Sequence, residues 1–223
     1  MTILPTGGPL LGRPVRLDLL REEDLDELAA LLAEPEIYTS GYVMHRRPAA
    51  VEDGRALARE RFLAHQGGAD GRGAGRTVYA VRLVTDDGGP AGTLVGTSSL
   101  LEAHLENESI HLGSTLYGHR WWGTAVNPEA KLLLLTHCFD ECGYGRVKIQ
   151  TDLLNVRSQA AIAKLGAQRE GVLRRDMRRE DGTFRDTVVY SIVIDEWPQV
   201  RAALDTRIGA LAWWPGPRYR FPN

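Results

Sequence analysis

Residues 120–130 read Arg-Trp-Trp-Gly-Thr-Ala-Val-Asn-Pro-Glu-Ala, and this stretch joins a predicted strand to a predicted helix. The strand ends near Tyr117, while Asn127 suits the N-cap of the helix, with Pro128 at its first position. Such a turn leaves unpaired backbone N–H groups at the positive end of a helix dipole, where an anion binds well. The local chemistry therefore predicts either a phosphate-binding loop or an ordinary tight crossover turn.

The residue types in the turn are compatible with the phosphate interpretation. Gly123 and Ala125 leave room for close approach, and Arg120 offers a charge-assisted contact. The chain contains neither the G-x-x-x-x-G-K-[ST] pattern of a P-loop nor the G-x-G-x-x-G dinucleotide fingerprint. The loop by itself does not identify its ligand.

Strands and helices alternate around this loop, which predicts a mixed α/β or α+β layered domain. Alternation and β-branched runs predict seven strands, at Arg13–Leu19, Thr77–Thr85, Thr93–Leu100, Ser109–Tyr117, Arg146–Thr151, Gln168–Arg178 and Arg185–Ile194. Apolar periodicity and capping residues predict helices at 21–32, 49–65, 127–142, 155–165 and 196–208. Residues 1–11 are expected to form a loose arm and 212–223 an irregular tail.

Composition indicates one globular domain of a reducing compartment. The chain has 223 residues, 43% of them hydrophobic, and a formal net charge of -2, which gives no general attraction to nucleic acid or anionic membranes. No apolar run approaches the roughly 20 residues of a membrane span, and no secretory signal is visible. Cys138 and Cys142 lie in one predicted helix, so we expect a cytoplasmic protein without a disulfide framework.

The 120–130 segment resembles the coenzyme loop of the GNAT superfamily of acetyl-CoA-dependent N-acetyltransferases, written [QR]-x-x-G-x-[GA]. The branch of the ribosomal-protein alanine N-acetyltransferases continues it as W-G-x-G-x-A-x-E-A. Residues 122–130 match its tryptophan, first glycine, glutamate and final alanine, and depart from it at 125–127. A second family motif, N-x-x-S, follows as Asn155-Val-Arg-Ser158. The resemblance covers residues 12–198 as one acetyltransferase domain and leaves 199–223 as a C-terminal helix and tail.

The resemblance implies an α+β fold with a central, mixed, mostly antiparallel sheet of about seven strands, flanked by helices. The sheet would splay between strands 4 and 5, here Glu108–Tyr117 and Arg146–Thr151, and the pantetheine would enter the gap. Acetyl-CoA is implied as co-substrate, with no metal. The implied coenzyme contacts are Leu112, Gly113, Arg120, Gly123, Thr124, Ala125, Val126, Asn155 and Arg157.

Direct acetyl transfer needs a donor for the oxyanion and a hydrogen bond or proton for the leaving thiolate. A backbone N–H near Leu112–Ser114 is the expected oxyanion donor, and Gly113 is expected to mark a bulge or a close approach. The family pattern makes Ser158 a candidate at the sulfur. Asn155 and Ser158 fit a simple helix cap equally well.

The attacking amine must be neutral, so a general base is useful. His111 is the first candidate because its ordinary pKa lies near neutrality, and a histidine on the solvent face is the open alternative. Glu108 and Glu106 are the carboxylate alternatives, followed by Tyr117 and Tyr190.

The acceptor is the least determined part of the prediction. We expect a primary amine, either a protein N-terminal α-amine or a small-molecule amine, bound by loops such as Glu34–Pro48 and Gly67–Gly75. The rival function is a non-catalytic acyl-CoA-binding or regulatory module. We expect neither nucleic acid nor membrane as a partner and leave a homodimer open. Further candidates for substrate contacts, or for solvated and packing positions, are Arg174, Arg175, Arg178, Arg179, Trp121, Trp122, Trp213 and Trp214.

Overall fold

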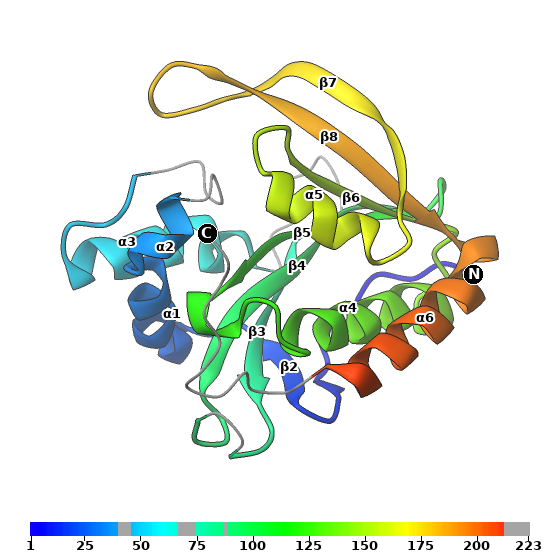
Figure 1. Cartoon of the computed structure of the whole chain (residues 1–223), viewed down its shortest axis with the longest axis horizontal. Helices are drawn as coiled ribbons and strands as arrows, with labels where there is room; N and C mark the ends of the chain where they lie inside the picture. Colours follow the sequence, from blue (N-terminus) through cyan, green and yellow to red (C-terminus); the bar gives the residue numbers. More distant parts are fainter. Residues whose placement is uncertain (40–45, 67–74, 87–88, 212–223) are drawn as a thin grey trace.

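The computed structural model of the chain describes residues 1–39, 46–66, 75–86 and 89–211 (Figure 1). One eight-stranded sheet forms its centre, in the order β1-β2-β3-β4-β5-β6-β8-β7. Every neighbouring pair is antiparallel except the parallel pair β5–β6. The strands are β1 (Leu10–Leu11), β2 (Val15–Leu19), β3 (Thr77–Leu83), β4 (Leu94–His104), β5 (Ser109–Tyr117), β6 (Arg146–Asp152), β7 (Gln168–Arg178) and β8 (Phe184–Val193).

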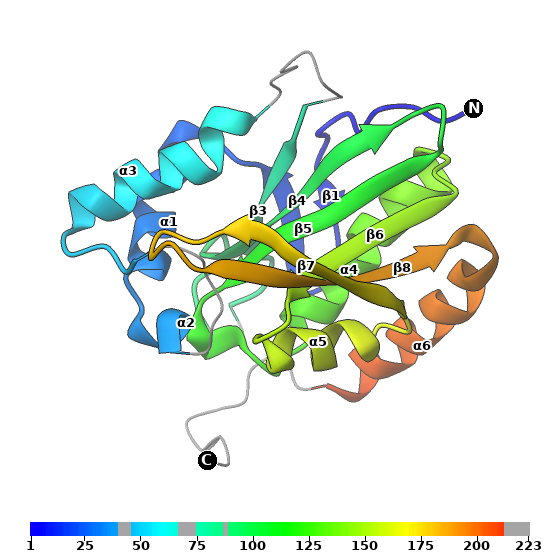
Figure 2. The same cartoon turned by 90° about the horizontal axis from the view of Figure 1, so that it is seen from above.

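Helices flank the sheet, so the predicted α+β fold is confirmed, with one strand more than predicted (Figure 2). The α-helices are α1 (Leu25–Leu32), α2 (Pro35–Thr39), α3 (Val51–Arg61), α4 (Val126–Thr136), α5 (Val156–Ala163) and α6 (Trp197–Ala210). The shorter helical turns are η1 (Glu22–Asp24), η2 (Leu63–His65), η3 (His119–Trp121), η4 (His137–Glu141) and η5 (Ile194–Glu196). No helix in the described part of the chain has both the length and the apolar content needed to cross a bilayer.

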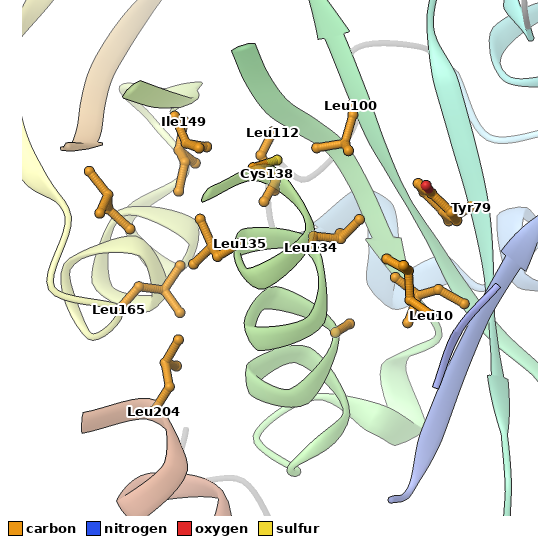
Figure 3. Close-up of a cluster of buried hydrophobic side chains, with 14 of the residues drawn as sticks. Leu10, Tyr79, Leu100, Leu112, Leu134, Leu135, Cys138, Ile149, Leu165 and Leu204 are labelled. Atoms are coloured by element: carbon orange, nitrogen blue, oxygen red, sulfur yellow. The ribbon is translucent and has the colours of Figure 1, made fainter. Parts of the chain in front are cut away.

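Strand β3 shows how the sheet separates two hydrophobic cores. Successive side chains of a strand point to opposite faces, and Val78 and Ala80 pack with the leucines of α1. Tyr79 and Val81 join the other core, which contains α4 and α6 and is shown in Figure 3. Every side chain of this strand from Val78 to Val81 is fully buried. The helices therefore hold the central strands from both sides.

The parallel strands β5 and β6 pair over only part of their length. Their register comprises Ser109↔Arg146, Ile110↔Val147 and His111↔Lys148, and no pair follows, although β5 continues to Tyr117. The two strands therefore part after His111. This is the splay that the resemblance implied between Glu108–Tyr117 and Arg146–Thr151.

A bulge interrupts β5 where the strands part. On the β4 side the register passes from Ser99↔Gly113 to Thr97↔Leu116, so Ser114 and Thr115 together face a single residue. Ser114 has a φ of 46°, in the left-handed region. A bulge removes backbone groups from the sheet ladder. The predicted irregularity at Gly113 therefore lies one residue further along the strand.

The predicted start of the 127–142 helix is wrong by one residue. Helix α4 begins at Val126 with Ala125 as its N-cap, so Asn127 is already helical. The Thr124 hydroxyl accepts a hydrogen bond from the Val126 N–H at 3.3 Å and donates one to the Trp121 carbonyl at 2.7 Å. The α-helical part ends at Thr136, followed by the π-helical turn η4.

The expectation of a loose N-terminal arm is also wrong. The arm is anchored, because Leu10 pairs with Leu17 and the Ile3 N–H donates to the Cys142 carbonyl at 2.9 Å. Glu129 is buried against this arm, and its Oε1 accepts from the Arg13 N–H at 2.9 Å. The glutamate of the 120–130 segment therefore fastens the first long strand to α4.

Candidate active site

A cavity of about 450 Å³ occupies the gap between β5 and β6. Its walls come from both strands, from the loop at 121–123 and from α4 and α5, with Met177 and Arg185 of the β7–β8 hairpin also lining it. Seven of the residues predicted from the sequence line this cavity, namely His111, Leu112, Gly113, Gly123, Asn155, Arg157 and Ser158. The splay therefore brings the two sequence motifs to one space.

A second hollow of about 470 Å³ adjoins the first, since both are lined by Gly123, Asn127 and Arg157. It adds two cations that the sequence did not suggest, Lys164 and Arg207. Burial lowers the pKa of the Arg207 guanidinium, but arginine starts from so high a pKa that the group stays charged at neutral pH. Three basic side chains from α5, its C-terminal end and α6 thus converge beside the start of α4, a charge distribution that suits phosphate groups.

The loop before α4 owes its shape to one glycine. Gly123 has a φ of 74°, and a Cβ placed there meets nothing within 4 Å. Its role is therefore backbone conformation rather than relief of crowding. Trp122 is held by a hydrogen bond from its Nε1 to the Tyr117 carbonyl at 2.9 Å, and the Arg157 guanidinium lies 3.2 Å from its ring centroid.

The remaining predicted loop residues divide between the hollow and the surroundings. Thr124 lines the second hollow, while Ala125 and Val126 are buried where α4 begins. Arg120 is exposed, with its guanidinium carbon 5.3 Å from the Trp121 ring centroid, and it lines neither space.

Asn155 forms the helix cap that the sequence predicted. Its side-chain oxygen accepts a hydrogen bond from the Ser158 N–H at 2.9 Å at the start of α5. The same two residues line the cavity. Capping therefore fixes where both side chains stand relative to the gap.

His111 is buried in the cavity wall, which contradicts the alternative of a solvent-facing histidine. Among the described residues neither ring nitrogen has a well-aligned hydrogen-bond partner, and its Nδ1 lies 3.4 Å from the Glu102 Oε2. A Cβ on Gly113 would come within 2.6 Å of the His111 Nε2, so only glycine fits under the ring. Burial lowers the pKa of His111, and the Glu102 carboxylate opposes that shift.

Glu102 is a site residue that the sequence did not reveal. The predicted strand ended at Leu100, whereas β4 continues to His104 with Glu102 at a φ of 52° beside a register shift. Its Oε2 lies 2.5 Å from the Lys148 Nζ. The polar contacts with His111 and Lys148 lower the pKa of Glu102 to about 2, so it is a carboxylate at neutral pH.

The two carboxylate alternatives for the base lie elsewhere. Glu106 and Glu108 are exposed in the β4–β5 turn and do not line the cavity. Glu108 has a φ of 48°, and its carbonyl accepts from the Gly145 N–H at 2.8 Å. Of the tyrosines, Tyr117 lines the cavity, whereas Tyr190 is buried in β8 outside the lining.

Lys131 is the second site residue missed in the sequence. It is buried on α4, lines the cavity, and donates to the Thr115 Oγ1 at 2.6 Å and to the Ser98 Oγ at 3.1 Å. Burial lowers the pKa of its ammonium to about 7. A lysine next to a leucine run resembles a helix edge in sequence, so only the packing reveals its burial.

The arginine-rich end of β7 is largely occupied within its own hairpin. Arg175 lies 3.9 Å above the Phe184 ring centroid, and Arg179 pairs with Asp152 and donates to the Phe184 carbonyl at 2.9 Å. Trp121 is buried in the core, while Trp213 and Trp214 lie outside the described residues, as do parts of the two predicted acceptor loops.

Together, the splayed sheet, the bulge beside the gap and the helix start beside a basic hollow define an acyl-coenzyme A-dependent acetyltransferase. Comparison with known families agrees, since the acetyltransferase (GNAT) domain family matches residues 15–168. The chain belongs to this family and is an acetyl-CoA-dependent N-acetyltransferase. A search among curated proteins finds no match.

Solved structures give the same result. A Thermus-type relative from T. thermophilus, described by inference as an acetyltransferase, is 36% identical with a TM-score of 0.75, covering 93% of this chain and 100% of its own. A GCN5-related N-acetyltransferase from Brucella melitensis is 25% identical with a TM-score of 0.78, covering 92% and 86%. Mycobacterium smegmatis RimJ, solved with CoA-disulfide, is 21% identical with a TM-score of 0.69, covering 92% and 95%, and shares the fold.

Proposed function

We propose that this chain transfers the acetyl group of acetyl-CoA directly to a primary amine, through a tetrahedral intermediate, in the cavity between β5 and β6. The acceptor is a protein N-terminal α-amine or a small-molecule amine. One observation carries the proposal: a single cavity joins His111 and the β5 bulge to Asn155 and Ser158 and continues into the basic hollow.

The hollow and the loop would hold the nucleotide half of acetyl-CoA. The pyrophosphate would meet the backbone of 123–126 at the positive end of α4, with Arg120 approaching from the outer rim. Lys164 and Arg207 would face the phosphate on the ribose, and Arg157, stacked on Trp122, lies between the two spaces. The pantetheine would run past Leu112, Gly113 and Asn155 into the gap.

His111 is assigned the role of general base. Burial lowers its pKa, so the imidazole is neutral at neutral pH and can accept a proton from the incoming ammonium. The carboxylate of Glu102, 3.4 Å from the Nδ1, would then stabilise the imidazolium that forms. Glu102 is partly exposed, which gives the proton a path to solvent.

The bulge and α5 would serve the oxyanion and the leaving group. At the bulge, backbone N–H groups near Leu112–Ser114 leave the ladder and can meet the developing oxyanion. The Ser158 hydroxyl lines the cavity from α5 and would hydrogen-bond to the departing sulfur.

The acceptor side is bounded by the β7–β8 hairpin. Glu180 in its turn lies 3.5 Å from Arg61 of α3 and accepts from the Arg46 N–H at 3.1 Å, so the hairpin is tied across to the N-terminal helices. Among the structural neighbours, a Vibrio cholerae protein, 19% identical, is described by inference as a ribosomal-protein-serine acetyltransferase. Peptides that mimic ribosomal-protein N termini therefore belong in an acceptor panel beside small amines.

Thiol release from acetyl-CoA, measured over this panel of peptides and small amines, tests the proposal. We expect release with at least one class of amine, matched mole for mole by the acetylated product in mass spectrometry. Tight coenzyme binding without thiol release for any acceptor would favour the non-catalytic acyl-CoA-binding module instead.

A further inference from the structure

Lys131 is a buried cation without an acidic partner. It is 5% exposed on α4, and it forms no ion pair with any described residue. Lysines are rarely fully buried unless they are paired, because taking the ammonium out of water is costly. The chain keeps this charge in the wall of the cavity rather than a neutral side chain that would pack as well.

The hydrogen bonds around Lys131 set the direction of a neighbouring hydroxyl. The ammonium can only donate, and it donates to the Thr115 Oγ1 at 2.6 Å and to the Ser98 Oγ at 3.1 Å. The two hydroxyl oxygens are 2.8 Å apart, so one of them donates to the other. Ser98 is fully buried, whereas Thr115 lines the cavity. With Ser98 as the donor, the Thr115 O–H is left to point into the cavity.

Thr115 also stands at the point where negative charge is expected. It is the second residue of the β5 bulge, next to Ser114, and the bulge is where backbone N–H groups leave the ladder. A hydroxyl that accepts from an ammonium is a stronger donor than an isolated one, and a low-dielectric site increases that effect.

We infer that Lys131 is a positioning residue that holds and polarises Thr115, whose hydroxyl donates to the acetyl carbonyl oxygen as negative charge develops there. The inference rests on the proposed function and extends it by two residues. No proton leaves Lys131 in this step, since its ammonium acts by charge alone. The assignment adds a side-chain donor to the backbone donors of the bulge.

The charge of Lys131 makes the inference testable by pH. Burial lowers the pKa of the ammonium to about 7, and the titratable groups that interact with it are Cys138 on the same helical segment and His111 on β5. The protonated lysine is the active form, so kcat should fall as pH rises through that value. The His111 base acts in the opposite sense, since its neutral form is active and kcat rises with pH through its lowered pKa. The two groups together predict a bell-shaped profile.

The experiment measures kcat, KM for acetyl-CoA and thermal melting for Lys131→Met, Lys131→Arg and Thr115→Val, with Ser98→Ala as the matched control. Lys131→Met should lower kcat by about 100-fold, the usual effect of losing one oxyanion donor, with KM unchanged. It should melt no lower than the wild type, because a buried charge is removed. Lys131→Arg should keep activity at high pH, since a guanidinium does not titrate there.

Thr115→Val should resemble Lys131→Met, whereas Ser98→Ala should retain most of kcat because the lysine still contacts Thr115. Equal losses in Thr115→Val and Ser98→Ala would overturn the inference, since the network would then be structural. Wild-type kcat in Lys131→Met would overturn it as well. If Lys131→Met does not fold, Lys131→Arg and Thr115→Val decide in the same way. A wild-type protein without turnover overturns the proposed function and this inference together, while an active wild type beside an equally active Lys131→Met overturns only the inference.

Discussion

The two ends of the cavity are built from different kinds of groups. At the coenzyme end, the contacts come mainly from backbone N–H groups at 123–126 and from a helix cap at Asn155. At the reacting end, they come from side chains on three separate elements, Glu102 of β4, His111 of β5 and Lys131 of α4. A backbone site depends on local conformation, which a short motif specifies. A side-chain site depends on register and bulges, which no short motif contains.

The sharpest way to break this comparison is His111→Ala at the reacting end. Removing the base should lower kcat by about 100- to 10,000-fold and abolish the acidic limb of the pH profile, while the affinity for coenzyme stays close to wild type. Steady-state kinetics over pH, with coenzyme affinity by calorimetry, checks both parts.

The control is His137→Ala, which removes another buried histidine, bonded to Glu141 and in contact with Cys142. It lines neither space beside the active site, so it should lower the melting temperature without changing the pH profile. An unchanged kcat across pH in His111→Ala would remove His111 from the mechanism.

At the coenzyme end, Gly123→Ala should act through the backbone. Gly123 has a φ of 74° with open space around a Cβ, so alanine costs conformational energy of about 1 kcal/mol and tilts the loop N–H groups. We expect KM for acetyl-CoA to rise by about tenfold, which corresponds to roughly 1.4 kcal/mol of lost binding, with kcat little changed.

Gly92→Ala is the matched control for that loop. Gly92 has a φ of 88° and equally open space, but it lies in the β3–β4 turn away from the coenzyme. Both variants should lose similar stability, and only Gly123→Ala should change KM. If both left KM unchanged, the loop would not hold the pyrophosphate.

Much of the coenzyme end was predictable from the sequence, and the reason is local. The strand at Ser109–Tyr117 was predicted with the bounds it has, because alternation and flanking turns define it. The Asn155 cap was predicted from residue type alone and is observed. The boundary at Asn127 was wrong because Thr124 supplies the polar contact one turn earlier.

The reacting end was only partly predictable. His111 was found because a histidine before Gly113 stands out in a strand, but its burial was not foreseen. Glu102 was missed because β4 runs four residues past the predicted end, through a residue with positive φ. Lys131 was missed because its burial depends on hydroxyls from two other strands, which lie 33 and 16 residues away in the chain.

Glu102→Gln sharpens the comparison within the reacting end. The carboxylate raises the pKa of His111, against the larger effect of burial, so its loss should lower that pKa further. The acidic limb should move to lower pH, and kcat at the optimum should fall by about tenfold as the imidazolium loses its partner. Kinetics over pH checks the direction. A shift to higher pH would show that Glu102 does not act on His111.

The smallest expected effect belongs to Arg207→Ala, at the far side of the basic hollow. Arg207 is partly buried beside Lys164, and its charge would face the ribose phosphate of the coenzyme. We expect KM for acetyl-CoA to rise several-fold, about 1 kcal/mol for a partly solvated charge contact, with kcat unchanged. Acetyl-dephospho-CoA, which lacks that phosphate, should bind the variant and the wild type equally.

Arg201→Ala on the same helix is the control, since Arg201 pairs with Asp140 outside the hollow and should leave both coenzymes unaffected. An equal loss with both coenzymes in Arg207→Ala would assign Arg207 to folding of α6 rather than to the phosphate. A loss confined to acetyl-CoA would show that this end of the site also uses side chains, from α6 and the end of α5. The contrast between the two ends would then concern the pyrophosphate loop alone, because phosphates at the edge of the site would be held as the reacting groups are, by residues distant in sequence.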